Sequence, residues 1–258
     1  MLIAGGDSFT WGDELPDCDG SSPSKLTWAS LLAKDMGLGY NCVARPGIGN
    51  KNIARRVIQA VDRNPEVKYV AVMWSYPARY DISLRQDILQ EGKKSQERYD
   101  YMPQFDNSWL TLSPYRALSF DERMKKYPKE LQQDPWFIEK INGWYRFEQD
   151  SGIGSLNDQF LGMISNEHYV QESLTNIFCL QSFLKEKNIP YTFCSCNNQL
   201  LELITSNFPL AKSIDTTLWQ DVEQGFVEWA KDNQYAISEM GHPGPDAHAH
   251  WFHDKYQR

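Results

Sequence analysis

Short apolar runs alternate with amphipathic segments along most of the chain, and this alternation constrains the fold more than any other feature. The clearest run covers residues 67–74 and is almost continuously apolar, which is typical of a strand buried on both faces. Further short runs at 1–6, 40–44, 189–196 and 235–237 predict other strands.

Apolar residues at helical spacing occupy the segments between these runs. They predict helices at about residues 28–36, 50–64, 170–184, 218–229 and 246–256, with Asn50 as the cap of the second helix. Strands that alternate with helices imply a parallel sheet covered by helices on both faces, so we expect an α/β fold.

Residues 81–165 lack this alternation of strand and helix patterns. The stretch mixes polar and aromatic residues, and its tryptophans and tyrosines argue against a disordered linker, because disordered segments are poor in aromatic residues. We therefore expect one domain over residues 1–258 with a large ordered insertion at about 81–165. The insertion is either a structural cap on the sheet or a lid that shapes a pocket, and the sequence leaves both interpretations open.

The charge balance disfavours nucleic acid as a partner. The chain has 34 acidic and 26 basic residues, and the basic ones adjoin only in the pairs Arg55-Arg56, Lys93-Lys94 and Lys125-Lys126. No apolar run approaches the roughly 20 residues that span a bilayer, and the chain opens without a basic leader. We therefore expect a cytoplasmic protein, cellular or virus-encoded, with no membrane insertion; the oligomeric state stays open.

The cysteines and glycines indicate no redox centre and no nucleotide site. The five cysteines are odd in number and contain no Cys-x-x-Cys pair, which favours reduced thiols that pack as small apolar side chains. Gly47 and Gly49 lack the third glycine and the lysine of a phosphate-binding loop, so no cofactor is expected.

Histidines near the C-terminus offer a metal-binding alternative. The candidate ligands are Asp246, His248, His250 and His253. Since no second group of cysteines or carboxylates accompanies them, we expect no metal and interpret these histidines as part of a final helix.

Ser8 is the first candidate for chemistry. It follows Gly5, Gly6 and Asp7 in a turn directly after the first predicted strand, where backbone N–H groups can be exposed beside its hydroxyl. A Gly-Asp-Ser sequence is also common in ordinary turns, with the serine capping a helix. A nucleophile therefore needs support from a base elsewhere in the chain.

A candidate base lies near the far end of the chain. Glu239 stands three residues before His242, in a segment framed by Gly241 and Pro243. This spacing lets the carboxylate hold one ring nitrogen and leaves the other for a serine. Asp246 with His248 is the alternative acid–base pair.

Three candidate residues each follow a predicted strand. They are Ser8, Gly47 and Ser75. Because the carboxyl ends of parallel strands share one edge of the sheet, where ligands of such folds bind, we expect these three residues to gather there.

These segments together resemble the SGNH (GDSL-type) hydrolase family. The resemblance rests on Gly-Asp-Ser after the first strand, a glycine after the second, and an acid-x-x-His-Pro segment near the C-terminus. It covers the chain from end to end except for residues 81–165. It implies a flavodoxin-like three-layer α/β/α sandwich.

The resemblance also implies roles for individual residues. Ser8 would be the nucleophile, His242 the general base and Glu239 the acid that orients it. The backbone N–H groups of Ser8 and Gly47 would form the oxyanion hole, with Gly49 as the second candidate for the glycine.

Two positions depart from the family pattern. Glu239 stands where the family has Asp, and a glutamate can do the same electrostatic work with a longer arm. The third family segment supplies an asparagine to the oxyanion hole, a donor worth about 2.7–4 kcal/mol in other hydrolases. Here Ser75 is the positional substitute, and Asn50 and Arg79 are further candidates; Arg79 would also suit an anionic substrate group.

We therefore expect a serine esterase or deacylase that acts through an acyl-enzyme on a small-molecule or carbohydrate ester, with acylated carbohydrates and lipids as substrate classes. Two alternatives stay open. One is a weakened SGNH scaffold that binds carbohydrate or protein, which the missing asparagine and the aromatic insertion motivate. The other is an O-acyltransferase, in which a hydroxyl acceptor replaces water.

Overall fold

The computed structural model describes residues 1–83, 109–127, 129–150 and 152–256. The chain divides into two compact units, a first unit of Met1–Pro77 with Val170–Arg258 and a second unit of Ala78–Tyr169. The second unit interrupts the first in sequence, over the stretch where the sequence predicts an insertion at about 81–165. Part of that stretch, 84–108, lies outside the described residues.

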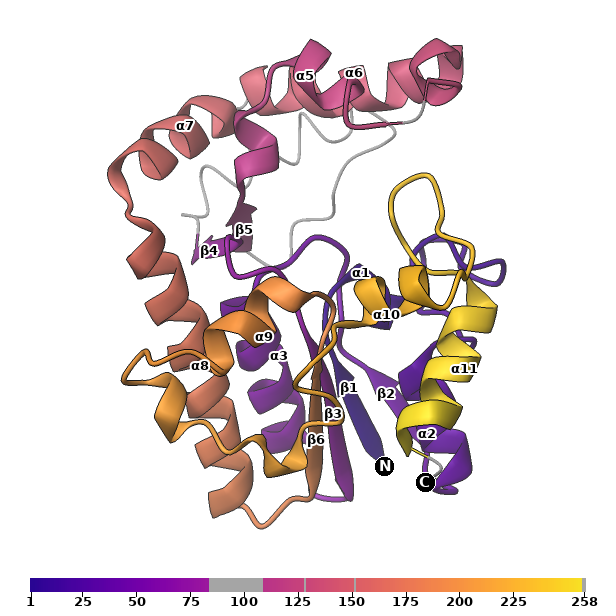
Figure 1. Ribbon diagram of the computed structural model, residues 1–258, viewed down its shortest axis with the longest axis vertical. Coiled ribbons are helices and arrows are strands. Elements are labelled where there is room, and N and C mark those ends of the chain that lie inside the picture. The colour runs from indigo at the N-terminus through magenta and orange to yellow at the C-terminus, as the bar shows by residue number, and fades with distance from the viewer. Residues whose placement is uncertain (84–108, 128, 151, 257–258) are drawn as a thin grey trace. The chain divides into compact units, whose positions relative to one another are not determined.

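The first unit is built on a four-stranded parallel sheet with the order β2-β1-β3-β6 (Figure 1). The strands are β1 Leu2–Gly5, β2 Tyr40–Cys42, β3 Tyr69–Trp74 and β6 Tyr191–Ser195. Ala4 pairs with both Cys42 and Ala71, and Met73 pairs with Cys194. The α/β class with a central parallel sheet is therefore confirmed. The strand predicted at 235–237 is reduced to Ile237, which forms an isolated antiparallel bridge with Pro243.

Helices follow or precede each of these strands. They are α1 Ser8–Trp11, α2 Trp28–Asp35, α3 Asn50–Arg63, α8 Asn166–Glu186, α9 Asn198–Ile204, α10 Phe226–Asp232 and α11 Pro245–Tyr256, with 3₁₀ turns η3 Ala211–Ser213 and η4 Thr216–Leu218. The helix expected at 218–229 starts only at Phe226. The reason is local, because the Asp221 side chain accepts the N–H groups of Glu223 and Gln224 in a turn, and Gly225 caps the helix.

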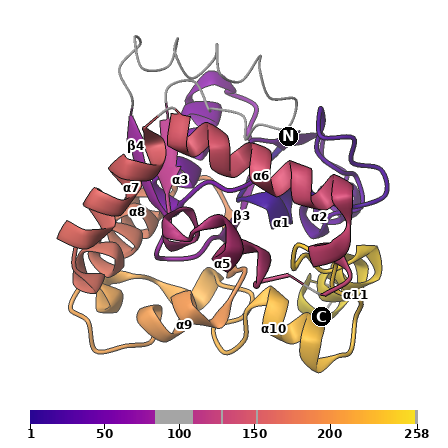
Figure 2. The same cartoon turned by 90° about the horizontal axis from the view of Figure 1, so that it is seen from above.

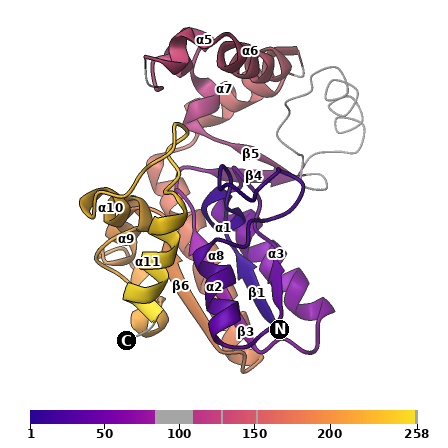
Figure 3. The same cartoon turned by 90° about the vertical axis from the view of Figure 1, so that its right-hand side faces the viewer.

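The two faces of the sheet are covered by different helices. Alternate strand residues point to opposite faces, so Ile3, Val72 and Phe193 pack with side chains of α3, α8 and α9. Ala4 and Met73 pack on the other face with α2, α10 and α11, and α2 and α11 lie side by side there (Figures 1 and 3). The first unit therefore has the three layers of an α/β/α arrangement.

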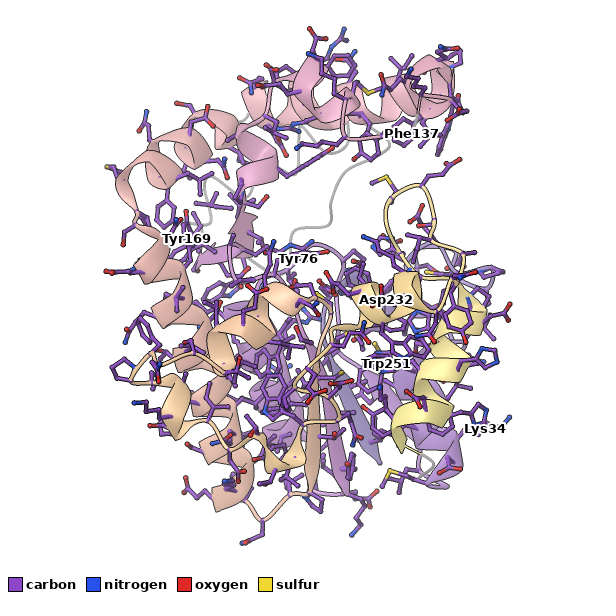
Figure 4. The ribbon with its side chains drawn as sticks, viewed as in Figure 1. Lys34, Tyr76, Phe137, Tyr169, Asp232 and Trp251 are labelled. Carbon is purple, nitrogen blue, oxygen red and sulfur yellow. The ribbon has the colours of Figure 1, made fainter. Side chains whose placement is uncertain are left out.

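Large aromatic residues fill the face covered by α2 and α11. Trp251, labelled in Figure 4, and Trp28 are both fully buried there. The Trp28 ring stacks on Tyr256 at 5.9 Å between centroids. Cys194 and Cys196 are buried on the same face, as their spacing of two predicts. All five cysteines are free. No described helix is both long and apolar enough to cross a membrane.

The second unit combines a small antiparallel sheet with helices. Its elements are β4 Tyr80–Ser83, β5 Trp109–Leu112, η1 Pro114–Ala117, α5 Phe120–Met124, η2 Leu131–Gln133, α6 Pro135–Asp150 and α7 Ile153–Met163. β4 pairs with β5, and both α5 and α7 pack against α6 (Figure 2).

A buried ion pair ties α5 to α6 in this unit. Arg123 is fully buried and bonds to Glu148, which is 4% exposed. The guanidinium also donates to the Leu118 carbonyl at 3.0 Å and lies over the rings of Tyr115 and Tyr145. A buried charge of this kind needs such partners, because its desolvation is otherwise costly.

Candidate active site

A one-turn helix carries Ser8 at the carboxyl end of β1. Asp7 caps α1 by accepting the Phe9 N–H at 3.2 Å, and Gly12 ends it with φ of 80°. Gly6 has φ of 155°, and a Cβ there would lie 2.2 Å from Thr10 Oγ1, so this tight turn requires glycine. Ser8 is 5% exposed in this setting.

The structure brings Ser8 and His242 together. Nε2 of His242 lies 2.8 Å from Oγ of Ser8, across 234 positions of sequence. The ring of Phe9 meets the imidazole edge-on at 5.0 Å between centroids. A serine hydroxyl within hydrogen-bond distance of an imidazole is the geometry that general-base activation needs.

The other imidazole nitrogen contacts a glutamate that the sequence analysis did not select. Nδ1 of His242 lies 2.5 Å from Oε2 of Glu14. Ser238 Oγ donates to the same carboxylate oxygen at 2.6 Å and accepts the His242 backbone N–H at 2.9 Å. A carboxylate on Nδ1 favours the tautomer in which Nε2 accepts from Ser8.

Glu14 is presented by a short, well-anchored loop. The Leu15 N–H donates to the Gly12 carbonyl at 3.1 Å, which closes a turn with Glu14 at its third position, and Leu15 is buried. Glu14 has φ of 67°, a left-handed conformation that costs a non-glycine residue roughly 1–2 kcal/mol. The turn therefore holds Glu14 in a conformation that its own backbone does not favour.

Further along, Asp17 fastens the same loop. Its carboxylate accepts from the Ser24 hydroxyl at 2.5 Å and from the Lys25 N–H at 2.8 Å. Burial tends to raise the pKa of Asp17, yet these hydrogen bonds hold it below its ordinary value. The Ser24 N–H donates to the Trp11 carbonyl at 2.9 Å, so the loop returns to the helix that carries Ser8.

Glu239 does not occupy the position that the sequence predicts for it. The Gly241 N–H donates to the Ser238 carbonyl at 3.0 Å, and the Ser238 N–H donates to the His242 carbonyl at 2.7 Å. These bonds form a tight turn that leaves Glu239 exposed, while Glu14 approaches His242 from another loop. The three-residue spacing between Glu239 and His242 is therefore a feature of the turn.

Ser75 and Asn50 form a buried scaffold beside the nucleophile. The Ser75 hydroxyl donates to Asp7 Oδ2 at 2.6 Å, and its N–H donates to Asn50 Oδ1 at 2.8 Å. The Asn50 amide donates to the Ser75 carbonyl and to Ser173 Oγ, both at 3.2 Å. Asn50 therefore binds the neighbouring strand end and Gly49 takes the cap of α3 instead.

This scaffold changes the expected oxyanion donors. The single hydroxyl proton of Ser75 is directed to Asp7, and both amide protons of Asn50 have acceptors, so neither side chain offers a proton to a developing oxyanion. Arg79 belongs to the second unit. Among the described residues, no hydrogen-bond acceptor is bonded to the backbone N–H of Ser8 or of Gly47.

The predicted gathering at the sheet edge is visible in the loops that follow the strands. The hydroxyl of Ser75, at the end of β3, meets Asp7 beside Ser8, and the next residue, Tyr76, marks this edge in Figure 4. The Arg45 N–H donates to the Gly6 carbonyl at 3.2 Å, which brings the loop after β2 to the same turn. Gly47 lies in that loop with φ of 78°.

The alternative pair, Asp246 and His248, lies elsewhere. His248 is 1% exposed, and its Nδ1 accepts the Trp28 N–H at 3.3 Å. Burial, with a smaller effect from nearby His242, lowers the pKa of His248 to about 3, so this ring stays neutral. Asp246 is exposed. The described residues contain no group of three or more His, Cys, Asp or Glu side chains that could hold a metal ion.

Sequence reasoning thus missed Glu14 and Ser238. Glu14 lies in an acidic loop with Asp13, Asp17 and Asp19, and no periodicity separates it from these neighbours. The available signal was Gly12 followed three positions later by the apolar Leu15, a pattern that favours a turn presenting the residues between them. Ser238 carries no signal beyond its nearness to His242.

Comparisons with known proteins identified no relative of this chain. No protein-family model matches the chain. Searches of curated proteins and of solved structures likewise found no match.

Proposed function

We propose that this chain is a serine hydrolase of the SGNH kind that cleaves carboxylic esters through an acyl-enzyme. One observation carries the proposal, namely the continuous hydrogen-bonded series from Ser8 Oγ through His242 to Glu14, at 2.8 Å and 2.5 Å. The same arrangement of nucleophile, base and orienting carboxylate recurs on unrelated folds and is identified by geometry.

The strand order supports the SGNH assignment. Counted within the sheet, β2-β1-β3-β6 has the order 2-1-3-4, which is the beginning of the flavodoxin-like order. In that fold class ligands bind outside the carboxyl ends of the strands, where Ser8, Gly47 and Ser75 follow β1, β2 and β3. The second unit would be the insertion of such a hydrolase.

The acylation step follows from the positions of the three side chains. His242 Nε2 takes the hydroxyl proton as Ser8 Oγ attacks the ester carbonyl, and the resulting imidazolium is stabilised by Glu14. The tetrahedral oxyanion accepts hydrogen bonds from the backbone N–H groups of Ser8 and Gly47. The intermediate then collapses, and His242 returns its proton to the departing alcohol.

Deacylation repeats these steps with water. His242 takes a proton from a water molecule, whose oxygen attacks the acyl carbonyl, and the second tetrahedral intermediate releases the carboxylic acid and regenerates Ser8. Because Ser75 and Asn50 offer no side-chain proton, the oxyanion hole rests on backbone N–H groups. We accordingly expect turnover slower than in a hydrolase that has the additional asparagine donor.

Hydrolysis of p-nitrophenyl acetate by the purified chain tests the proposal. We expect release of p-nitrophenol with an initial burst, complete loss of the burst in Ser8→Ala, and unchanged activity in Ser22→Ala, which alters an exposed serine. Equal activity in Ser8→Ala and wild type would contradict the nucleophile assignment. Failure to cleave a panel of acetylated sugars and short-chain esters, together with tight binding of the sugars, would favour a binding module.

A further inference from the structure

Ser238 occupies a junction between the base and its carboxylate. Its hydroxyl donates to Glu14 Oε2 at 2.6 Å, the same oxygen that lies 2.5 Å from His242 Nδ1. The hydroxyl oxygen also accepts the backbone N–H of His242 at 2.9 Å. One side chain thus contacts both partners of the acid–base pair.

The side chains of the two partners differ in exposure and in their link to Ser238. Ser238 and His242 share one tight turn, because the Ser238 N–H donates to the His242 carbonyl at 2.7 Å. Glu14 comes from a loop 228 positions away in sequence, and its side chain is 30% exposed against 12% for His242. A partly exposed glutamate has several rotamers and loses entropy when only one of them is used.

We propose that Ser238 is a positioning residue that fixes the Glu14 carboxylate on Nδ1 of His242. Two hydrogen bonds to one carboxylate oxygen restrict the orientation of the carboxylate more than one bond does. The inference rests on the proposed function for its effect on catalysis. The predicted effect of Ser238 on the His242 tautomer, through Glu14, does not depend on that function.

The bond from His242 N–H to Ser238 Oγ gives a competing explanation, in which Ser238 only closes the turn. The two explanations differ in their dependence on Glu14. If Ser238 acts through the carboxylate, replacing Ser238 has no effect once Glu14 is replaced. If Ser238 only closes the turn, the effect is the same with and without the carboxylate.

The first experiment measures the tautomer of His242 by ¹⁵N NMR of the histidine rings at a pH where the imidazole is neutral, with His242→Gln used for assignment. We expect the Nδ1–H tautomer to dominate in wild type and in Ser238→Thr, which keeps a hydroxyl. We expect the Nε2–H tautomer to rise in Ser238→Ala. A tautomer ratio that is equal in Ser238→Ala and wild type overturns the inference, whatever the ester assays show.

The second experiment is a double-mutant cycle on ester hydrolysis with Ser238→Ala, Glu14→Ala and the double variant. We expect Ser238→Ala to lower kcat about tenfold with KM nearly unchanged, and to have no further effect in the Glu14→Ala background. An equal loss in both backgrounds, or no loss in either, overturns the positioning role. Ser8→Ala separates the two proposals, because its failure to abolish hydrolysis overturns the proposed function alone.

Discussion

Nδ1 of His242 lies 2.5 Å from Oε2 of Glu14, although the two residues are 228 positions apart and Glu239 is only three residues before the histidine. Glu14 lies three residues after the end of the helix that carries Ser8, so the nucleophile and the carboxylate come from one continuous segment. The base alone comes from the distant C-terminal part of the chain. The N-terminal loop therefore supplies the carboxylate that contacts the His242 imidazole.

Replacing each glutamate by glutamine distinguishes the two candidates directly. We expect Glu14→Gln to lower kcat/KM for ester hydrolysis by about 10²–10⁴-fold, because an amide cannot stabilise the imidazolium. Glu239→Gln serves as the matched control, since Glu239 is exposed, and its kcat/KM should stay within about twofold of wild type. The opposite ranking in a kinetic assay would restore Glu239 as the acid.

Glycine at position 14 separates stability from activity. With φ of 67°, Glu14 is strained where glycine is not, so Glu14→Gly should raise the free energy of unfolding or leave it unchanged while activity is lost. Urea unfolding and ester hydrolysis measured on the same preparation test this. Clear destabilisation of Glu14→Gly would show that the carboxylate contributes more to the fold than its backbone strain costs.

The buried His248 predicts a loss of stability in acid. Burial lowers its folded-state pKa to about 3, whereas the unfolded chain has a value near 6.5. The unfolded state therefore gains a proton first as the pH falls from about 6.5 toward 3, and the free energy of unfolding decreases by up to about 1.4 kcal/mol per pH unit. Above the unfolded pKa both states are neutral and this residue contributes no pH dependence.

His248→Asn is the variant that checks this prediction, because its amide oxygen can still accept the Trp28 N–H without titrating. Denaturant unfolding between pH 4 and about 7.5 should show a shallower pH dependence for His248→Asn than for wild type, by about one proton. Parallel curves for the two proteins would mean that His248 is protonated in the folded state.

The bond between Ser75 and Asp7 should matter for stability. Asp7 is fully buried, and Ser75→Ala removes a hydroxyl that donates to its carboxylate at 2.6 Å. We expect a decrease of about 1–3 kcal/mol in the free energy of unfolding, measured in urea. The exposed Ser22→Ala should stay within about 0.5 kcal/mol of wild type, and an equally small effect at Ser75 would contradict the prediction.

Two glycines test the backbone donor of the oxyanion hole. Gly47 and Gly37 have φ of 78° and 64°, and a Cβ at either position would meet nothing within 4 Å. Replacing either by alanine should therefore cost a similar strain, roughly 1–2 kcal/mol of stability. Only Gly47→Ala should also lower kcat, by about tenfold or more, because the strain would reorient the N–H that the proposed function assigns to the oxyanion hole. Equal kcat values in the two variants would remove Gly47 from the oxyanion hole.

The sequence by itself determined the four strands of the parallel sheet and the residues that follow them, but not the small sheet of β4 and β5. The apolar runs at 1–6, 40–44, 67–74 and 189–196 each contain one strand of the parallel sheet. The residues of β1, β3 and β6 are nearly all buried, whereas those of the edge strand β2 are half-buried. Parallel strands place their carboxyl ends at one edge, so Ser8, Gly47 and Ser75 were expected to gather there, and the structure shows Ser75 bonded to Asp7, the residue before Ser8.

Only the tertiary structure decided which carboxylate reaches His242 and what Ser75 and Asn50 do. Spacing favoured Glu239, but the hydrogen bonds of its turn leave it exposed and the fold brings the Glu14 loop to the imidazole. Likewise, Asn50 could cap its own helix or bind Ser75, and the packed sheet edge selects the second. A side-chain partner that comes from a loop far away in sequence leaves no periodic trace, because loop geometry is set by anchoring contacts such as Leu15 and Asp17 and not by a repeat in the chain.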